Sequence, residues 1–174
     1  MSKDSIALIG FMATGKSTVG KALKECLGKD YKFIETDQII IKMAGKSIPK
    51  IFEEDGEAKF REYEIEACRK AVRLSKSIIS CGGGVVLNES NIEILKKTCH
   101  MVLLTATPEV IYNRAMKEGK ENRPVINKKD PFKEIGKVLR YRETYYNKSA
   151  EIIIDTTEKS IEMIVEEILL QTNL

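Results

Sequence analysis

The chain has 174 residues, of which 43% are hydrophobic, 6% aromatic and 32% charged, a composition typical of one globular domain around one main core. The net charge is +3, from 29 Lys and Arg against 26 Asp and Glu, and both signs are interspersed, so we expect no nucleic-acid partner. No apolar run approaches the roughly 18 residues of a membrane span and no signal-peptide pattern opens the chain, so we expect a cytoplasmic protein without a membrane partner.

Short apolar segments alternate with helical patterns from the N-terminus onward. Apolar runs bounded by polar or glycine-containing stretches predict buried strands, and apolar residues three and four positions apart predict helices. The predicted strands cover residues 5–9, 32–35, 77–80, 101–104 and 152–154. The predicted helices cover residues 16–27, a stretch ending near 41, 57–74, a segment that begins at Pro108 after a capping Thr107, 132–148 and 161–170.

The order of these elements predicts the fold class. Buried strands separated by helices favour a parallel sheet covered on both faces, with ligands bound at the carboxyl ends of the strands. The polar stretch 117–130 contains glycine and proline and is expected to form a mobile loop. We therefore predict an α/β fold in a single domain that spans residues 1–174.

Residues 10–17 read Gly-Phe-Met-Ala-Thr-Gly-Lys-Ser, which matches the phosphate-loop pattern G-x-x-x-x-G-K-[ST] between a predicted strand and a predicted helix. Glycines let backbone N–H groups turn toward a polyphosphate, and the new helix adds the positive end of its dipole. Lys16 can then reach the β- and γ-phosphates, and Ser17 can bind Mg²⁺. A chance glycine turn with a surface lysine is the alternative, which this context disfavours. The loop predicts nucleotide binding but does not identify an acceptor.

Asp37 follows the second predicted strand directly. A kinase for a hydroxyl substrate needs a carboxylate near the acceptor oxygen, and Asp37 would lie beside the phosphate loop if the first two strands are neighbours in the sheet. An aspartate at this position can equally cap the helix that begins near Gln38. On position alone, both interpretations of Asp37 stay open.

Arg61 lies in a predicted helix with Glu57 four residues before it and Glu64 three residues after it. On the residues alone, this pattern favours a surface ion-pair residue. Gly82, Gly83 and Gly84 follow a buried strand, and because glycine carries an entropic cost, close approach of a ligand to the backbone explains them better than stability does.

Three further arginines lie around the predicted mobile loop. Arg114 precedes it, Arg123 lies within it and Arg142 follows it. Together their guanidinium groups could converge on ATP and an anionic substrate, whereas each arginine taken singly would be assigned to the solvated surface.

The order of these motifs resembles that of the shikimate kinases, from Ile6 to about Ile168. The motifs are GFMATGKST at 10–18, ETD at 35–37, FREYE at 60–64, GGG at 82–84, RP at 123–124 and RETYY at 142–146. The resemblance implies a five-stranded parallel sheet of the nucleoside-monophosphate-kinase type within the P-loop NTPases, a substrate-binding segment at about 36–65 and a lid at about 115–128. It also implies a monomer that converts ATP and shikimate into ADP and 3-phosphoshikimate, in the biosynthesis of chorismate and the aromatic amino acids.

The resemblance also implies roles for individual residues. Asp37 matches the proposed base that binds shikimate hydroxyls, Arg61 and Arg142 match the arginines that bind the shikimate carboxylate, and Gly83 matches a backbone contact to the substrate. Lys16 and Arg123 would join Asp37 as catalytic residues, Arg123 by binding the phosphates. The residues that would bind ATP are Ala13, Thr14, Gly15, Lys16, Ser17, Thr18, Arg114 at the adenine, Arg123 and Lys159. Ser17 and Glu35 would hold Mg²⁺, Glu35 through water.

The chain departs from the family pattern at several positions. Glu35 stands where the family usually has aspartate, Ala13 replaces a frequent glycine, and the lid between Arg114 and Arg123 is about two residues longer than the family pattern implies. Cys81 stands where threonine is common, and like the other three cysteines it is expected to be a reduced, buried thiol rather than a zinc ligand.

Two alternatives to this function remain. Another phosphate-loop kinase, acting on gluconate or a nucleoside monophosphate, would share Lys16 but not the substrate arginines. A nucleotide-binding switch without catalysis would give Asp37, Arg61 and Arg142 no common role.

Overall fold

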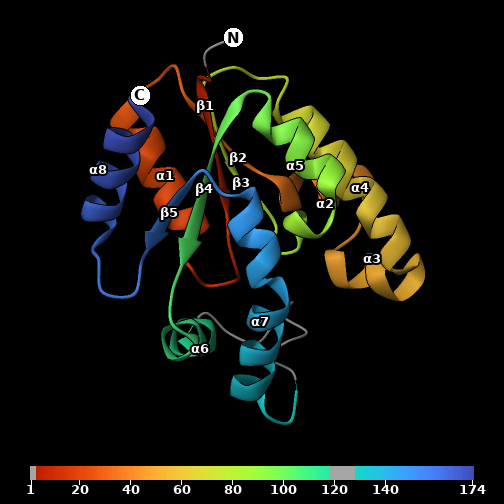
Figure 1. The fold of residues 1–174 in the computed structure, drawn as a ribbon. Coiled ribbons are helices and arrows are strands. Elements are labelled where there is room, and N and C mark those ends of the chain that lie inside the picture. The colour runs from red at the N-terminus through yellow and green to blue at the C-terminus, as the bar shows by residue number, and fades with distance from the viewer. Residues whose placement is uncertain (1–2, 118–127) are drawn as a thin grey trace.

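The computed structural model describes residues 3–117 and 128–174, and its centre is a parallel sheet with helices on both faces (Figure 1). The strands of this sheet are β1 (Ser5–Ile9), β2 (Lys32–Glu35), β3 (Ser77–Ser80), β4 (Cys99–Thr105) and β5 (Ile152–Asp155). Their order is β2-β3-β1-β4-β5, and each pairing is parallel. The predicted α/β fold with a five-stranded parallel sheet is confirmed.

The helices lie between successive strands and, in one case, after the last strand. They are α1 (Lys16–Leu27), α2 (Thr36–Ala44), α3 (Ile48–Glu54), α4 (Gly56–Ala71), the 3-10 turn η1 (Val85–Leu87), α5 (Glu89–Lys96), α6 (Pro108–Lys117), α7 (Pro131–Ser149) and α8 (Ile161–Thr172). Helices α1 and α8 cover one face of the sheet, while α4, α5 and α7 lie on the other (Figure 1). Within the described residues, no helix is long and apolar enough to span a membrane.

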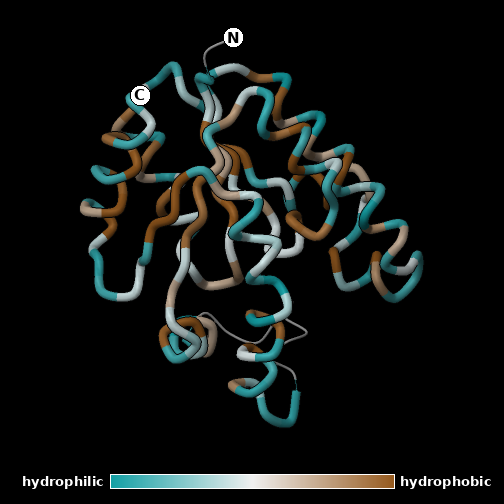
Figure 2. Tube along the Cα trace, viewed as in Figure 1, coloured by the Kyte–Doolittle hydropathy of each residue, from teal (hydrophilic) through white to brown (hydrophobic). Residues whose placement is uncertain are grey.

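The strand residues alternate between two cores because successive side chains of a strand point to opposite faces of the sheet. Ile6 and Leu8 pack against α1 and α8, whereas Ala7 and Ile9 pack against α4, α5 and α7. The hydrophobic residues accordingly gather in the strands and on the inner helix faces (Figure 2). Burial on both faces explains why β1 is apolar at four of its five positions.

A third and smaller core joins α2, α3 and α4 beside the sheet. Ile40, Ile51 and Phe60 are buried there, and the main contacts of α3 are with α2 and α4. In Figure 1 this group of helices lies on the β2 side of the molecule. The group therefore has a core of its own in addition to the contacts that join it to the sheet.

Several element boundaries differ from the prediction. The helix predicted over 57–74 ends at Ala71, and the short helices α3 and α5 were not predicted. The N-cap Asn88 opens α5 by accepting a hydrogen bond from the Ser90 amide at 3.0 Å. The predicted start of α6 is confirmed, with Thr107 Oγ1 accepting from the Val110 amide at 3.4 Å. Cys26 is exposed, so the prediction of four buried thiols is wrong at that position.

The order of the strands also corrects one premise of the sequence analysis. Strand β3 lies between β1 and β2, so the two strands that precede the phosphate loop and Asp37 are not neighbours. Because the strands are parallel, their carboxyl ends still meet at one edge of the sheet. The phosphate loop, the start of α2 and the glycines that follow β3 all begin at that edge.

Candidate active site

The phosphate loop joins β1 to α1, and its backbone conformation requires glycine at its first position. Gly10 has φ +140°, and a Cβ there would overlap the Leu104 carbonyl oxygen. Lys16 Nζ donates to the carbonyl oxygens of Gly10 at 2.9 Å and Phe11 at 2.7 Å. Helix α1 begins at Lys16 without a side-chain cap, so the amide groups of its first turn suit an anionic ligand.

Ala13 and Thr14 stabilise the loop in different ways. Ala13 adopts the left-handed conformation with φ 57°, which explains why glycine is frequent at this position, since a Cβ is strained there. Thr14 is 1% exposed and donates from Oγ1 to the Phe11 carbonyl at 2.9 Å. The Thr14 side chain therefore braces the loop from inside.

Two side chains with oxygen atoms of the kind that suits a cation lie at the phosphate loop. Ser17 Oγ donates to Glu35 Oε1 at 2.5 Å and lies 3.5 Å from Ser80 Oγ. Hydroxyl and carboxylate oxygens are ligands that Mg²⁺ accepts, together with water and substrate phosphates. Glutamate therefore reaches Ser17 from the position where the family usually has aspartate. In residues 3–117 and 128–174, no group of three or more His, Cys, Asp and Glu side chains is arranged to hold a metal.

Asp37 lies inside the first turn of α2 and does not cap it. The helix begins at Thr36 with Glu35 at the N-cap position and no side-chain cap bond, so the capping interpretation is wrong. Burial raises the pKa of Asp37, the Lys16 cation opposes this shift, and the Glu35 carboxylate adds to it. A carboxylate with a raised pKa near the lysine of the phosphate loop is suited to accept a proton.

The three glycines after β3 lie beside three side chains that are predicted to bind the substrate. None of the three has a positive φ, and space explains the first and the third glycine, whereas a Cβ at Gly83 would make only ordinary contacts. The distances from a Cβ built on each glycine are 2.9 Å from Gly82 to Asp37 Oδ1, 3.6 Å from Gly83 to Arg142 Nη1 and 2.9 Å from Gly84 to Arg61 Nη1. The loop thus brings Asp37, Arg61 and Arg142 together.

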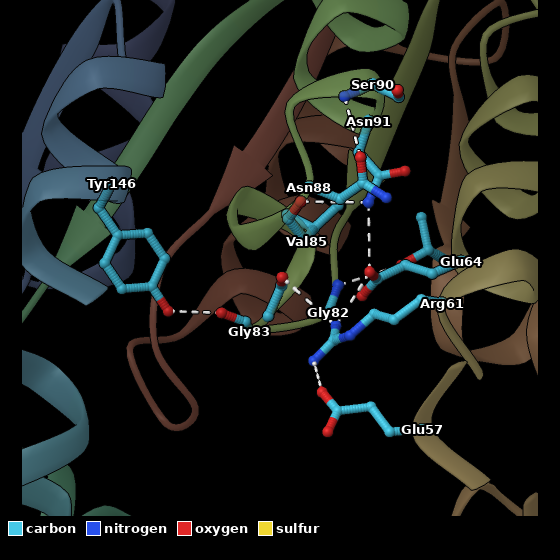
Figure 3. Close-up of polar contacts among 12 residues, drawn as sticks. Glu57, Arg61, Glu64, Gly82, Gly83, Val85, Asn88, Ser90, Asn91 and Tyr146 are labelled. Atoms are coloured by element: carbon cyan, nitrogen blue, oxygen red, sulfur yellow. Dashed lines mark hydrogen bonds and ion pairs between the residues drawn. The ribbon is translucent and has the colours of Figure 1, made fainter. Parts of the chain in front are cut away.

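Arg61 makes both of the ion pairs that its helical spacing predicts, and it also lines a cavity beside the phosphate loop. Its Nη2 lies 3.1 Å from Glu57 Oε1, and its Nη1 lies 3.0 Å from Glu64 Oε2 (Figure 3). The Glu57 side chain is 67% exposed, whereas that of Glu64 is 1% exposed. Arg61 is therefore fixed by a buried carboxylate on one side and contacts a displaceable, exposed one on the other.

Glu64 was not recognised from the sequence as part of the site. Asn91 Nδ2 donates to Glu64 Oε2 at 3.2 Å and to the Val85 carbonyl at 3.1 Å (Figure 3). Burial raises the pKa of Glu64, and Arg61 opposes this shift. Helical spacing could have revealed Glu64, because it lies four residues after the buried Phe60 and three before the buried Ala67.

Arg142 lies on α7 and lines the cavity beside the phosphate loop. Its guanidinium carbon is 5.9 Å from the centre of the Phe11 ring. Its Nε is buried and has no hydrogen-bond partner among the described residues. Because a buried donor without a partner is costly, the contacts of this side chain are incomplete within the described residues.

The residues predicted at the adenine side lie on another part of the sheet edge. Arg114 donates to the Thr156 carbonyl at 2.8 Å and to the Ala13 carbonyl at 3.4 Å, which links α6 to the phosphate loop. Lys159 forms an ion pair of 2.5 Å with Glu167 of α8. Arg123 and residues 118–127 of the predicted lid lie outside the described residues.

A cavity of about 950 Å³ opens between the phosphate loop and α2, α3 and α4. The predicted site residues that line it are Ala13, Gly15, Lys16, Ser17, Thr18, Glu35, Asp37, Arg61, Gly83 and Arg142. Its lining also includes residues that the sequence did not indicate, among them Phe52, Phe60, Glu64 and Ser80. Thr14, Arg114 and Lys159 are not part of this lining.

A phosphate loop that faces a carboxylate and two arginines across one cavity defines a phosphotransferase of the P-loop class with a small anionic acceptor. The family model described as shikimate kinase matches residues 12–173. The chain belongs to the shikimate kinase family, and as a member it is a kinase.

Curated relatives and solved structures agree with this assignment. A shikimate kinase of Caldanaerobacter subterraneus subsp. tengcongensis is 45% identical over 95% of this chain and 94% of its own length. One of Enterococcus faecalis is 36% identical over 97% of this chain and 98% of its own length. The structure of shikimate kinase from Acinetobacter baumannii in complex with shikimate matches with a TM-score of 0.89 at 29% identity, covering 99% of this chain and 95% of that chain.

Proposed function

We propose that the chain transfers the γ-phosphoryl group of ATP to the 3-hydroxyl of shikimate, giving ADP and 3-phosphoshikimate. The observation that carries this proposal is the convergence of Asp37, Arg61 and Arg142 on three consecutive glycines beside Lys16. A solved relative of similar structure was determined in complex with shikimate. Two guanidinium groups and a carboxylate suit a substrate that carries one carboxylate and several hydroxyls.

The acceptor binds with its carboxylate between Arg61 and Arg142, which turns a hydroxyl toward the phosphate loop. Asp37 accepts the proton of that hydroxyl while its oxygen forms a bond to the γ-phosphorus. The bond from this phosphorus to the β–γ bridging oxygen breaks, and ADP leaves. Lys16 offsets the charge of the transferring group, and the raised pKa of Asp37 suits it to take the proton.

The remaining roles belong to the nucleotide. The loop from Ala13 to Thr18 holds the phosphates, Arg114 and Lys159 contact the adenine side, and Arg123 contacts the phosphates. Ser17 would bind Mg²⁺ through its hydroxyl, and Glu35, which accepts a hydrogen bond from Ser17, would reach the ion through water. When bound, this ion neutralises charge on the β- and γ-phosphates.

We also propose the setting of the reaction. The substrate-binding segment is residues 36–65, the lid is residues 115–128, and both belong to a single kinase domain. The enzyme acts as a cytoplasmic monomer in the biosynthesis of chorismate and the aromatic amino acids, without nucleic-acid or membrane partners.

A coupled assay of ADP release tests the acceptor. We expect turnover with shikimate and background rates with gluconate and nucleoside monophosphates. Turnover with gluconate or a nucleotide, and none with shikimate, would refute the proposal. ATP binding without turnover on any of these acceptors would favour a nucleotide-binding switch.

A further inference from the structure

Tyr146 lies one helical turn after Arg142 on α7. Its ring belongs to the core beside the three glycines 82–84 that follow β3. Its side chain is nearly buried, with 4% of the residue exposed. The hydroxyl donates a hydrogen bond of 2.6 Å to the Gly83 carbonyl oxygen (Figure 3). Packing alone would be served by phenylalanine, so the hydroxyl is the part of this residue that requires a separate explanation.

The Tyr146 hydroxyl acts as a permanent donor. Burial raises the pKa of Tyr146 to about 12, and the Arg142 guanidinium opposes that rise. The phenol therefore keeps its proton at any pH at which the enzyme would work. Because the peptide group is planar and trans, holding the Gly83 carbonyl toward α7 turns the Gly84 N–H away from it.

Gly82, Gly83 and Gly84 each make a polar contact with a different helix. Thr36 Oγ1 of α2 accepts from the Gly82 amide at 3.0 Å, and Arg61 Nη1 of α4 approaches the Gly84 carbonyl at 3.5 Å. Tyr146 provides the attachment to α7 at the middle glycine. Each of these helices also carries one of the three residues that converge on the loop, so the attachments fix the three side chains relative to one another.

We infer that Tyr146 is a positioning residue, whose hydroxyl fixes the Gly83 peptide relative to the Arg142 guanidinium and thereby sets the affinity for the anionic acceptor. The identity of that acceptor rests on the proposed function. The positioning itself rests on the contact between Tyr146 and Gly83 and on the shared helix face of Tyr146 and Arg142.

The kinetic test compares Tyr146→Phe with Tyr145→Phe, which removes a hydroxyl one residue earlier on the same helix from a 39% exposed side chain. We expect Tyr146→Phe to raise the KM for shikimate about 3-fold to 10-fold, the effect of one lost hydrogen bond, and to leave the KM for ATP within about twofold. Tyr145→Phe should change neither value. If Tyr146 were only structural, Tyr146→Phe would lower the Tm but would not raise the KM for shikimate more than the KM for ATP. That result would overturn the inference.

Hydrogen exchange of the ligand-free protein tests the same contact without any substrate. Amides in the peptide 81–87 should exchange faster in Tyr146→Phe than in the wild type or in Tyr145→Phe. Unchanged exchange would overturn the inference even if the wild type phosphorylates shikimate. Absence of turnover by the wild type on shikimate would refute the proposed function, and faster exchange in Tyr146→Phe would then still support the fixing of the loop.

Discussion

Asp37 is the residue at which the requirements of catalysis and of stability oppose each other most directly. Burial is the largest influence on its carboxyl group and raises its pKa, while Lys16 only partly compensates. A raised folded-state pKa means that the ionised group destabilises the fold. Asp37 destabilises the fold least when it is protonated. The folded state therefore has its full stability from this group below the unfolded-state pKa, and it loses that stability as the pH rises through the folded-state pKa.

The variant Asp37→Asn should therefore lose activity and gain stability. We expect kcat with shikimate to fall about 10²–10⁴-fold, as for loss of a general base, with ATP binding retained. At pH 7 the Tm should exceed that of the wild type, and the difference should shrink as the pH approaches 4. Calorimetry across this pH range measures the effect, and Asp30→Asn, at an exposed aspartate, is the control. A lower Tm than the wild type at pH 7, or unchanged turnover, would contradict the assignment.

Glu57 is an ion-pair partner of Arg61, the residue proposed to bind the substrate carboxylate. Its side chain is 67% exposed and lies 3.1 Å from Arg61 Nη2, and such exposed ion pairs contribute only about 0–1 kcal/mol. We expect Glu57→Gln to lower the KM for shikimate by a factor of up to about 5, because about 1 kcal/mol corresponds to that factor. The matched control is Glu62→Gln, which removes the partner of Lys59 on the same helix. Steady-state kinetics at low ionic strength measures the KM for shikimate in both variants. A higher KM in Glu57→Gln would contradict the expectation and show that the contact with Glu57 assists binding.

At the scale of elements, the segment after β3 joins the three helices that carry the acceptor residues. A Cβ at Gly82 would crowd Asp37 Oδ1 and a Cβ at Gly84 would crowd Arg61 Nη1, both at 2.9 Å, whereas a Cβ at Gly83 would make an ordinary contact. A substitution in this segment should therefore change substrate binding more than it changes folding.

The variant Gly84→Ala tests this interpretation of the segment. The new Cβ would lie 2.9 Å from Arg61 Nη1, and because that atom ends a flexible side chain, Arg61 moves rather than the backbone. We expect the KM for shikimate to rise about 10-fold or more, equivalent to a weakened charge-assisted hydrogen bond, with the KM for ATP and the Tm close to the wild type.

Gly136→Ala is the matched control for Gly84→Ala. Among the described residues, a Cβ at Gly136 would meet only Arg140 Nη1 at 3.5 Å, an ordinary contact within α7. Alanine is favoured over glycine in a helix by about 1 kcal/mol, so this variant should be slightly more stable and fully active. A large loss of Tm in Gly84→Ala, with both KM values unchanged, would contradict the role of space at the glycine segment.

The sequence predicted the elements with long or distinctive patterns and missed the short ones. The phosphate loop and α1 were predicted with their exact limits because a motif and an amphipathic helix coincide there. Helix α3 has 7 residues and α5 has 8, too few to show a clear helical period. Tyr146 was missed because its role depends on a contact with Gly83 that only the tertiary structure creates. Glu64 was considered only as a surface partner of Arg61, because its burial and its hydrogen bond from Asn91 also depend on tertiary structure.

At the scale of the whole molecule, the two sides of the site rest on different cores. The phosphate loop is anchored in the cores on both faces of the sheet, through Ile9, Phe11 and Val19. The helices α2, α3 and α4 share the small core around Ile51. Because local stability follows the extent of burial, we expect α3 and its contacts to open at lower free energy than the central strands.

Replacing Ile51 by alanine should destabilise the substrate side of the site more than the nucleotide side. Ile51 is fully buried, and such a substitution typically costs about 2–5 kcal/mol. If α3 opens locally, amide exchange over 48–54 should accelerate about tenfold or more while β1 and β4 change little, and the KM for shikimate should rise with the KM for ATP unchanged. The control is Ile168→Ala, at another fully buried isoleucine, in the core beneath α8, which should lower the Tm without separating the two KM values. If Ile51→Ala accelerated exchange equally in α3 and β4, the small core would unfold only together with the whole domain. In that case the cavity would lower the free energy of global unfolding and would not create a separate local opening of α3.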